Sequence, residues 1–479
     1  MQAFQNYIAG EWVDGVGTRP NINPSDIGDV IGHYAQADVA QTEQAIAAAH
    51  AALPAWASST PQQRFDVLDG IGNELLARRE EIGRLLSREE GKTLPEGMGE
   101  THRAAMIFKF FAAEALRGAG ESLPSVRPGV AVEMSRSPMG VVGLIAPWNF
   151  PIAIPAWKIA PALAFGNTVV FKPAELVPGC AWVLADIISR SALPKGAFNL
   201  VMGPGSQVGA TLVESPRVNA ISFTGSVATG RRLISSCAAR QAKVQAEMGG
   251  KNPLLVLDDA DLDVAVNAAV QSGYFSTGQR CTASSRIIVG AGIHDAFVDA
   301  VVKKLAGLKV DHALKAGTDI GPVVDARQLE QNLHYVGLAV REGGELVYGG
   351  TAVERETPGF YMLPALITGT TNQMTISREE VFGPVCNVIK VGSYEEGLAV
   401  ANDTEFGLSS GICTRSLKHA THFKQHAQAG MVMVNLPTAG VDYHVPFGGT
   451  KGSSYGPREQ GSYAREFYTT VKTAYCFAG

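Results

Sequence analysis

The feature that most constrains the fold is a run of short apolar segments that begins at Gly140, each ending at a glycine or a proline. The stretches between them have the apolar spacing of helices. The segments include VVGLIAP, TVVFKP, AFNLVMG, NAISFTG and KVQAEMG. Buried parallel strands are short and mostly apolar, and helices connect them. The sequence therefore predicts an α/β fold built on a parallel sheet, and LLVLDDAD, SRIIVG and CNVIKVG predict a second sheet from Pro253 onward.

The regions on either side of this pattern predict different structures. Residues 39–120 are predicted to be helical: residues 40–52 are Ala-rich with apolar helical spacing, and Pro61 suits the first turn of a helix that continues through residues 64–77. The helical pattern breaks at residues 118–128. Residues 465–477 are rich in β-branched and aromatic side chains, which predicts a terminal strand that pairs outside its own domain.

Length, charge and cysteine spacing exclude several classes of protein. A chain of 479 residues exceeds what one hydrophobic core usually serves, so two or more domains are expected. The net charge of -5 and the lack of a long basic run argue against a nucleic-acid partner. No apolar run reaches the roughly 18 residues of a membrane span, and the start of the sequence lacks the pattern of a secretory signal. The six cysteines form no CxxC pair or metal-binding spacing, so we expect reduced thiols, no metal and a cytoplasmic location.

Cys281 is the cysteine with the most reactive setting. Its neighbours are small or polar, whereas the other cysteines lie in apolar stretches or near the end of the chain. The preceding residue is Arg280, and an adjacent cation favours the reactive thiolate. The alternative is a buried thiol that packs as a small hydrophobic group.

Two polar residues follow predicted strands at points where a parallel sheet often binds ligands. Glu247 comes directly after a strand and before a glycine turn, so it is a candidate acid or base in a crevice, or else a solvated loop carboxylate. Asn149 lies between Pro147 and Pro151, which fix the backbone around it. A held amide suits an oxyanion hole, and the alternative is an ordinary turn-forming Asn.

Two further strand ends carry features of dinucleotide binding. Lys172 and Glu175 follow the strand TVVF, and an acid beyond a strand end can bind ribose hydroxyls. The loop at residues 223–230 would present a helix N-terminus to a pyrophosphate, although its glycines, Gly225 and Gly230, do not have GxGxxG spacing.

Taken in order, these residues resemble the motif set of the aldehyde dehydrogenase superfamily. Three more stretches match it, at residues 379–384, 446–449 and 458–461, so the resemblance covers essentially the whole chain. It implies an NAD(P)-dependent oxidation of an aldehyde to a carboxylate through a thiohemiacetal and a thioester, with no metal.

The resemblance also implies residue roles. Cys281 resembles the nucleophile, Glu247 the general base and Asn149 the oxyanion donor, together with the Cys281 backbone N–H. Glu459 resembles a second acid that some members use in proton relay, and Lys158 the lysine beside that path. The residues implied to bind the cofactor are Trp148, Lys172, Glu175, Gly205, Gly209, Gly225, Ser226, Glu380 and Phe382. Those implied to line the substrate tunnel are Phe150, Trp157 and Phe447.

The fold implied by the resemblance has three parts. A Rossmann-like cofactor domain would comprise residues 1–117 and 139–248, and an α/β catalytic domain residues 249–446. A small β-ribbon of residues 118–138 would combine with residues 447–479 as an oligomerisation element, giving a homodimer or homotetramer. The ribbon supplies a pairing partner for the predicted terminal strand.

The substrate is predicted from two observations. Residues 434–449 and 451–459 look like those of the 2,5-dioxopentanoate (α-ketoglutaric semialdehyde) dehydrogenases, and residues 279–283 are similar to that group and to non-phosphorylating glyceraldehyde-3-phosphate dehydrogenases. Both substrates are anionic. Arg280 adjoins the nucleophile, and Arg103 lies on a helix that faces the substrate tunnel in the family, so both are candidates to bind a carboxylate. The alternatives are a solvated Arg103 and a structural Arg280.

The sequence alone does not decide between NAD and NADP, and other activities remain as alternatives. Glu175 should repel a 2'-phosphate and so favour NAD about ten- to a hundredfold, while Lys172 could bind that phosphate and admit NADP. A broad-range or betaine-aldehyde enzyme would need an apolar or aromatic tunnel. A succinic or glutaric semialdehyde enzyme would share the anionic substrate. A CoA-acylating enzyme would lack the base, and a non-catalytic homologue would have lost the nucleophile or base, but Glu247 and Cys281 are present.

Overall fold

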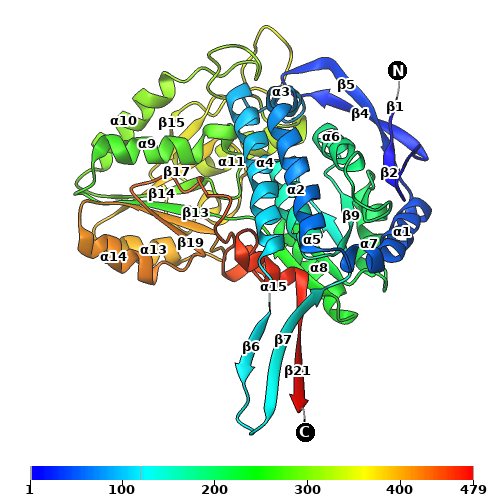
Figure 1. Cartoon of the computed structure of the whole chain (residues 1–479). Helices are drawn as coiled ribbons and strands as arrows, with labels where there is room; N and C mark the ends of the chain where they lie inside the picture. The colour runs from blue at the N-terminus through cyan, green and yellow to red at the C-terminus, as the bar shows by residue number, and fades with distance from the viewer. Residues whose placement is uncertain (1–2, 119, 478) are drawn as a thin grey trace.

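The computed structural model describes residues 3–118, 120–477 and 479. Two sheets with helices packed around them lie side by side, and a narrow three-stranded sheet projects from the body (Figure 1). The predicted α/β class with two mostly parallel sheets is confirmed. Over these residues no helix is both long and apolar enough to cross a bilayer.

The first sheet has eight strands in the order β20-β12-β11-β8-β9-β10-β2-β3. The strands β12, β11, β8, β9 and β10 run parallel. Their bounds are Lys243–Glu247, Ala220–Thr224, Val141–Ile145, Thr168–Lys172 and Phe198–Leu200, as the apolar segments predicted. The remaining strands are β20 (Ser454–Tyr455), β2 (Asn6–Ile8) and β3 (Glu11–Val13). The strand order reverses at β8, so the carboxyl ends of β8 and β11 border a crevice of the kind that binds ligands in open α/β sheets.

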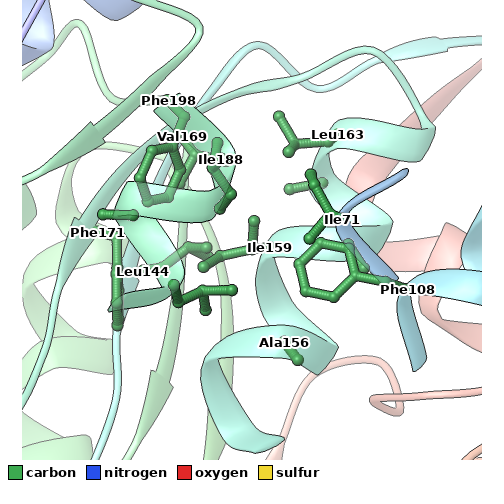
Figure 2. Close-up of a cluster of buried hydrophobic side chains, with 14 of the residues drawn as sticks. Ile71, Phe108, Leu144, Ala156, Ile159, Leu163, Val169, Phe171, Ile188 and Phe198 are labelled. Carbon is green, nitrogen blue, oxygen red and sulfur yellow. The ribbon is translucent and has the colours of Figure 1, made fainter. Parts of the chain in front are cut away.

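Helices cover this sheet, and one of them is buried along its full length. The helices are α5 (Ala153–Ala164), α6 (Pro178–Ser189), α7 (Ala210–Glu214) and α8 (Val227–Ala239). Every residue of α5 is buried, because the sheet covers one side and α2 and α4 the other. Figure 2 shows this packing, with Ile159 of α5 between Phe108 of α4 and Phe171 of β9. The core therefore fixes α5 rigidly against the crevice.

The region predicted as helical forms four helices, and the segment before it forms strands that were not predicted. The helices are α1 (Val39–Ala57), α2 (Pro61–Ala77), α3 (Arg79–Glu90) and α4 (Leu94–Leu116), with Pro61 in the first turn of α2. The strands β1 (Ala3–Phe4), β4 (Gly17–Asn23) and β5 (Asp26–Gln36) make a separate sheet.

The second large sheet has the order β15-β16-β17-β14-β13-β18-β19 and is parallel except at β15. Its strands are Glu345–Tyr348, Ala365–Thr368, Val385–Val391, Ser284–Gly290, Asn252–Val256, Ser409–Cys413 and Met431–Val434, in that order. Its helices are α9 (Leu262–Gly273), α10 (His294–Ala306), α11 (Ala326–Arg341), α12 (Thr375–Arg378), α13 (Tyr394–Asn402) and α14 (Leu417–His426).

The projecting sheet joins β6 (Glu121–Pro124), β7 (Val130–Pro138) and β21 (Thr469–Phe477). All nine residues of β21 pair antiparallel with β7, so the predicted partner of the terminal strand is confirmed. The predicted start of that strand is wrong, because Arg465–Tyr468 forms the short helix α15 and packs Phe467 and Tyr468 into the core. Residues 454 and 455, assigned above to the C-terminal element, pair with β12 instead. The division into domains stays a prediction.

Candidate active site

Two cavities meet at Cys281, which lines both. The first encloses about 450 Å³ and lies at the carboxyl ends of β8 and β11. Among its lining residues are Trp148, Asn149, Gly225, Ser226, Glu380 and Phe382. The second encloses about 360 Å³. Among its lining residues are Arg103, Phe150, Trp157, Arg280 and Phe447. The structure thus brings part of the predicted cofactor set and the predicted substrate set to two cavities that share one thiol.

The pKa of the Cys281 thiol is higher than the sequence suggested. Burial raises its pKa to about 12, and the charges of Glu380 and Glu247 add to the shift, while the backbone N–H groups of Cys281 and Thr282 oppose it. The charge of Arg280 does favour the Cys281 thiolate, as predicted, but the effect of burial on the thiol is larger. The Arg280 guanidinium donates to three backbone carbonyls, of Phe275 (3.1 Å), Gln271 (2.8 Å) and Ala439 (3.4 Å), so it is directed at the backbone.

Asn149 follows β8 in a tight loop and is buried. Its side-chain Nδ2 donates to the backbone carbonyl of Gln279 at 3.0 Å, two residues before Cys281. An amide nitrogen carries two N–H groups, so the second remains for another acceptor. This hydrogen bond sets the amide beside the thiol, where an oxyanion donor is needed.

Glu247 is the last residue of β12 and is buried. Its Oε2 accepts a hydrogen bond of 2.5 Å from the hydroxyl of Ser454, its register partner on β20. Burial raises the pKa of Glu247 well above its usual value, and the nearby charge of Glu459 raises it further. A carboxyl group held in this way can act as a base near neutral pH.

Lys158 and Glu459 form a fully buried ion pair beneath the site. Lys158 Nζ also donates to Ser222 Oγ at 2.8 Å, and Ser222 Oγ lies 3.1 Å from Glu459 Oε1. Within the part of the chain that the structure describes, Glu459 Oε2 has no hydrogen-bond partner. One carboxylate oxygen is therefore available to take up a proton or a water molecule.

Lys172, Glu175, Gly205 and Gly209 lie together next to the first cavity. The backbone N–H of Gly205 donates to Glu175 Oε1 at 3.3 Å, and a Cβ added to Gly209 would contact the Lys172 side chain at 3.8 Å. Burial lowers the pKa of Lys172 to about 8, and its Nζ donates to the carbonyl of Pro173 at 2.9 Å. None of the four lines the 450 Å³ cavity, although Leu176, next to Glu175, does.

Arg19 of β4 is a residue of this cluster that the sequence analysis missed. Its Nη1 is 2.7 Å from Glu175 Oε2, in an ion pair whose side chains are 47% and 29% exposed. Both oxygens of Glu175 are thus engaged, one by Arg19 and one by Gly205. No local pattern around Arg19 could have revealed this, because β4 reaches Glu175 only through the folded chain.

The predicted pyrophosphate loop leads into α8. Ser226 is the N-cap of that helix, and its Oγ accepts from the Thr229 N–H at 3.4 Å. Thr224 Oγ1, also in the lining of the cavity, is buried without a partner among the described residues. A helix N-terminus with an unsatisfied hydroxyl beside it suits an anionic group.

Glu380 and Phe382 close the first cavity from the second large sheet. Glu380 Oε1 accepts from the Gly250 N–H at 2.9 Å, and burial raises its pKa to about 7. Phe382 has a left-handed φ of 61° and contacts Trp148 edge-on, with 5.4 Å between the ring centroids.

Arg103 enters the second cavity from α4, the helix on which the sequence placed it. Its Nη2 donates to Gln460 Oε1 at 3.3 Å, and its guanidinium lies 5.8 Å from the Trp157 ring. Two lining residues of this cavity have buried donors without an acceptor in the described part of the protein, Arg103 Nε and Trp157 Nε1, and so does Gln460 Nε2 beside Arg103. Gln460 and Ser454 were missed by the sequence analysis, although both lie in or beside the matching stretch at residues 458–461.

Comparisons with known proteins agree with this geometry. The family model described as "Aldehyde dehydrogenase family" matches residues 12–474. This chain belongs to the aldehyde dehydrogenase family. A relative from Bacillus subtilis (strain 168) named alpha-ketoglutaric semialdehyde dehydrogenase is 42% identical over 99% of this chain and 98% of its own length. One from Haloferax volcanii, named alpha-ketoglutarate semialdehyde dehydrogenase, is 40% identical over 98% of both chains.

The family fold is also seen among solved structures. A betaine aldehyde dehydrogenase from Staphylococcus aureus, crystallised in complex with NAD+, superposes with a TM-score of 0.97 at 32% identity. The match covers 99% of this chain and 95% of that chain.

Across residues 3–118, 120–477 and 479, no group of three or more His, Cys, Asp or Glu side chains is arranged to hold a metal ion.

Proposed function

We propose that this member of the aldehyde dehydrogenase family oxidises a carboxylate-bearing aldehyde, 2,5-dioxopentanoate in the first place, to the corresponding acid, here 2-oxoglutarate. The main support for a carboxylate-bearing substrate is the set of unpaired buried donors at and around Arg103. A buried donor without an acceptor costs about 1–3 kcal/mol, and a substrate carboxylate would supply the missing acceptors. Betaine aldehyde carries a permanent positive charge, so Arg103 disfavours it.

Arg103 is the arginine that we assign to the substrate carboxylate. Arg280 was predicted to share this role, but its three hydrogen bonds to backbone carbonyls support a structural role in the loop around the thiol. Trp157 and Phe447, whose ring centroids are 5.2 Å apart, would form an apolar wall for the carbon chain.

The residues of the first cavity, together with the cluster of Lys172 and Glu175 beside it, fit a nicotinamide dinucleotide. The α8 N-terminus with Gly225, Ser226 and the unpaired Thr224 hydroxyl suits a pyrophosphate, and the buried Lys172 with Glu175 suits a ribose. Glu380, Phe382 and Trp148 would hold the nicotinamide end. We propose NAD as the preferred cofactor, with NADP as the alternative. When bound, the cofactor accepts the hydride that the aldehyde carbon loses.

The remaining chemistry belongs to the chain's own side chains. The Cys281 thiol loses its proton to solvent, and the resulting thiolate attacks the aldehyde carbon to give a thiohemiacetal, whose oxyanion accepts from Asn149 Nδ2 and the Cys281 N–H. After oxidation a thioester remains on Cys281. Glu247 takes a proton from a water molecule that attacks this thioester, and the product acid leaves with Cys281 restored as a thiol. Lys158 and Glu459 offer a buried path for that proton.

The projecting sheet supports the proposed homodimer or homotetramer. Its exposed apolar side chains include Leu123, Val126, Val471, Tyr475 and Phe477. Such a group of apolar side chains on a protruding sheet suits contact with a second copy. The cytoplasmic location stays a prediction.

Two variants test the proposed reaction. Cys281→Ala should lose oxidation of 2,5-dioxopentanoate while its NAD affinity stays close to that of the wild type. Glu247→Gln should release about one NADH per active site and then stall, with an acyl group on Cys281 visible by intact-protein mass spectrometry, because the thioester is not hydrolysed. Turnover of Cys281→Ala within tenfold of the wild type would refute the thiol mechanism.

A further inference from the structure

The first turns of α4 contact both loops that carry the proposed catalytic groups. Lys92, Glu96 and Glu100 lie at or just before the start of this helix, which spans Leu94–Leu116. We call these three residues the α4 brace. The brace is not part of the mechanism described above.

One side of the brace holds the Asn149 loop. Lys92 is buried, and its Nζ lies 2.9 Å from Glu100 Oε2 and donates to the backbone carbonyl of Asn149. Glu100 Oε1 accepts from the N–H groups of Ile152 and Ala153, both at 3.1 Å, where α5 begins. This ion pair therefore holds the loop at Asn149 itself and at the carboxyl end of the loop, where α5 begins.

The other side of the brace holds the loop that leads to Cys281. Glu96 Oε1 accepts from the backbone N–H of Ser276 at 2.8 Å and from its hydroxyl at 3.0 Å. Glu96 Oε2 accepts from the N–H and the hydroxyl of Thr93, at 3.0 and 2.9 Å, and so completes a capping box of α4. One oxygen of Glu96 therefore binds the start of α4, and the other binds the loop that leads to Cys281.

The segment that Glu96 holds has an unusual backbone. Ser276, Thr277 and Gly278 all have left-handed φ angles, of 51°, 55° and 65°. A left-handed conformation costs a non-glycine residue roughly 1–2 kcal/mol, so two in succession persist only where contacts enforce them. The hydrogen bonds from Ser276 to Glu96 are such contacts, and the turn lies three residues before Cys281.

We propose that Glu96 is a positioning residue for Cys281. It holds the left-handed turn at residues 276–278, while the Lys92–Glu100 pair on the same brace holds Asn149, so that one helix start sets the thiol and the amide relative to each other. The inference rests on the proposed nucleophilic role of Cys281 for its effect on activity, but its effect on the loop does not depend on that role.

The test compares Glu96→Ala and Glu96→Gln with a matched control, Gln63→Ala. Gln63 completes the same kind of capping box with Thr60 at the start of α2, away from both cavities. Glu96→Ala should lower kcat about ten- to a hundredfold and leave the KM for NAD unchanged within about twofold, since small displacements of reacting groups are costly. Glu96→Gln retains one acceptor oxygen and should lose less. Gln63→Ala should retain kcat.

Two further measurements separate positioning from general stability. Hydrogen exchange of the peptide spanning residues 275–281 should be faster in Glu96→Ala than in Gln63→Ala. The two variants are compared at temperatures equally far below their own melting temperatures. Adding Ser276→Gly should restore part of kcat to Glu96→Gln, because glycine adopts the left-handed turn without strain. A kcat for Glu96→Ala within twofold of the wild type, or unchanged exchange of this peptide, would overturn the proposal. Hydrogen exchange is measured without substrate, so its result does not depend on whether Cys281→Ala shows Cys281 to be the nucleophile.

Discussion

The Asn149 side chain donates a hydrogen bond to the carbonyl of Gln279, which joins the end of one parallel strand to the loop of the proposed nucleophile. The two residues are 130 positions apart in the sequence. Because this contact uses one N–H of the amide, the other can meet an oxyanion on the carbon attacked by Cys281.

Asn149→Ala should lower kcat by about a hundred- to a thousandfold, the usual effect of removing one oxyanion donor. The KM for NAD should change little, because the amide serves the reacting carbonyl. The measurement is steady-state kinetics with 2,5-dioxopentanoate, alongside a melting curve that verifies folding. A loss smaller than tenfold would show that Asn149 does not serve as a donor in the transition state.

The rate of Cys281 alkylation by iodoacetamide should rise about tenfold for each pH unit from 7 to 9 in the enzyme without cofactor, with no plateau. The reason is that burial raises the thiol pKa to about 12, so the thiolate fraction keeps increasing over this range. Peptide mapping by mass spectrometry separates Cys281 from the exposed Cys476. A plateau below pH 8 would mean that a nearby cation lowers the thiol pKa after all.

The strands and their connections were predictable because buried parallel strands carry an apolar signal in their own residues. The same holds for Ser226 at the start of α8 and for Glu247 at the end of β12, since each is defined by the strand before it. The residues from 3 to 36 were not predicted. Most of their strands are short or polar, as in the largely exposed β4, and β2 pairs with β10, far along the chain.

The interactions of side chains were less predictable than their positions. Arg280 adjoins Cys281 in sequence, yet its guanidinium turns to three carbonyls, a choice that only the folded loop determines. Arg103 was placed on the correct helix, but its unpaired Nε became visible only with Trp157 and Gln460 around it. Glu96 did have a sequence signal, since Thr93 and Glu96 have the spacing of a capping box.

Arg19 changes the expectation for cofactor choice. The sequence predicted a ten- to a hundredfold preference for NAD from the repulsion by Glu175, partly offset by Lys172, but Arg19 also neutralises that carboxylate and reduces its repulsion of a 2'-phosphate. We therefore expect the wild type to prefer NAD over NADP by a factor near the lower end of that range, about tenfold. Arg19→Ala should increase this preference by a further factor of up to about five, which is the scale of an exposed ion pair.

The control for this prediction is Arg217→Ala, which breaks the exposed Arg217–Glu43 ion pair in the same part of the molecule. Dissociation constants for NAD and NADP can be measured by quenching of tryptophan fluorescence, together with kcat/KM for each cofactor. Equal ratios in Arg19→Ala and the wild type would mean that Arg19 has no part in the choice.

The most direct test of the account is kcat/KM for 2,5-dioxopentanoate and for pentanal, a neutral aldehyde of similar length, in the wild type and in Arg103→Ala. A charge-assisted hydrogen bond contributes about 1.5–3 kcal/mol, so the variant should lose roughly 10- to 150-fold with the anionic substrate. The loss should appear mainly in KM, because the carboxylate is bound equally in the ground and transition states. Pentanal should lose little. An equal loss with both aldehydes would contradict the carboxylate site and favour a broad-range aldehyde dehydrogenase.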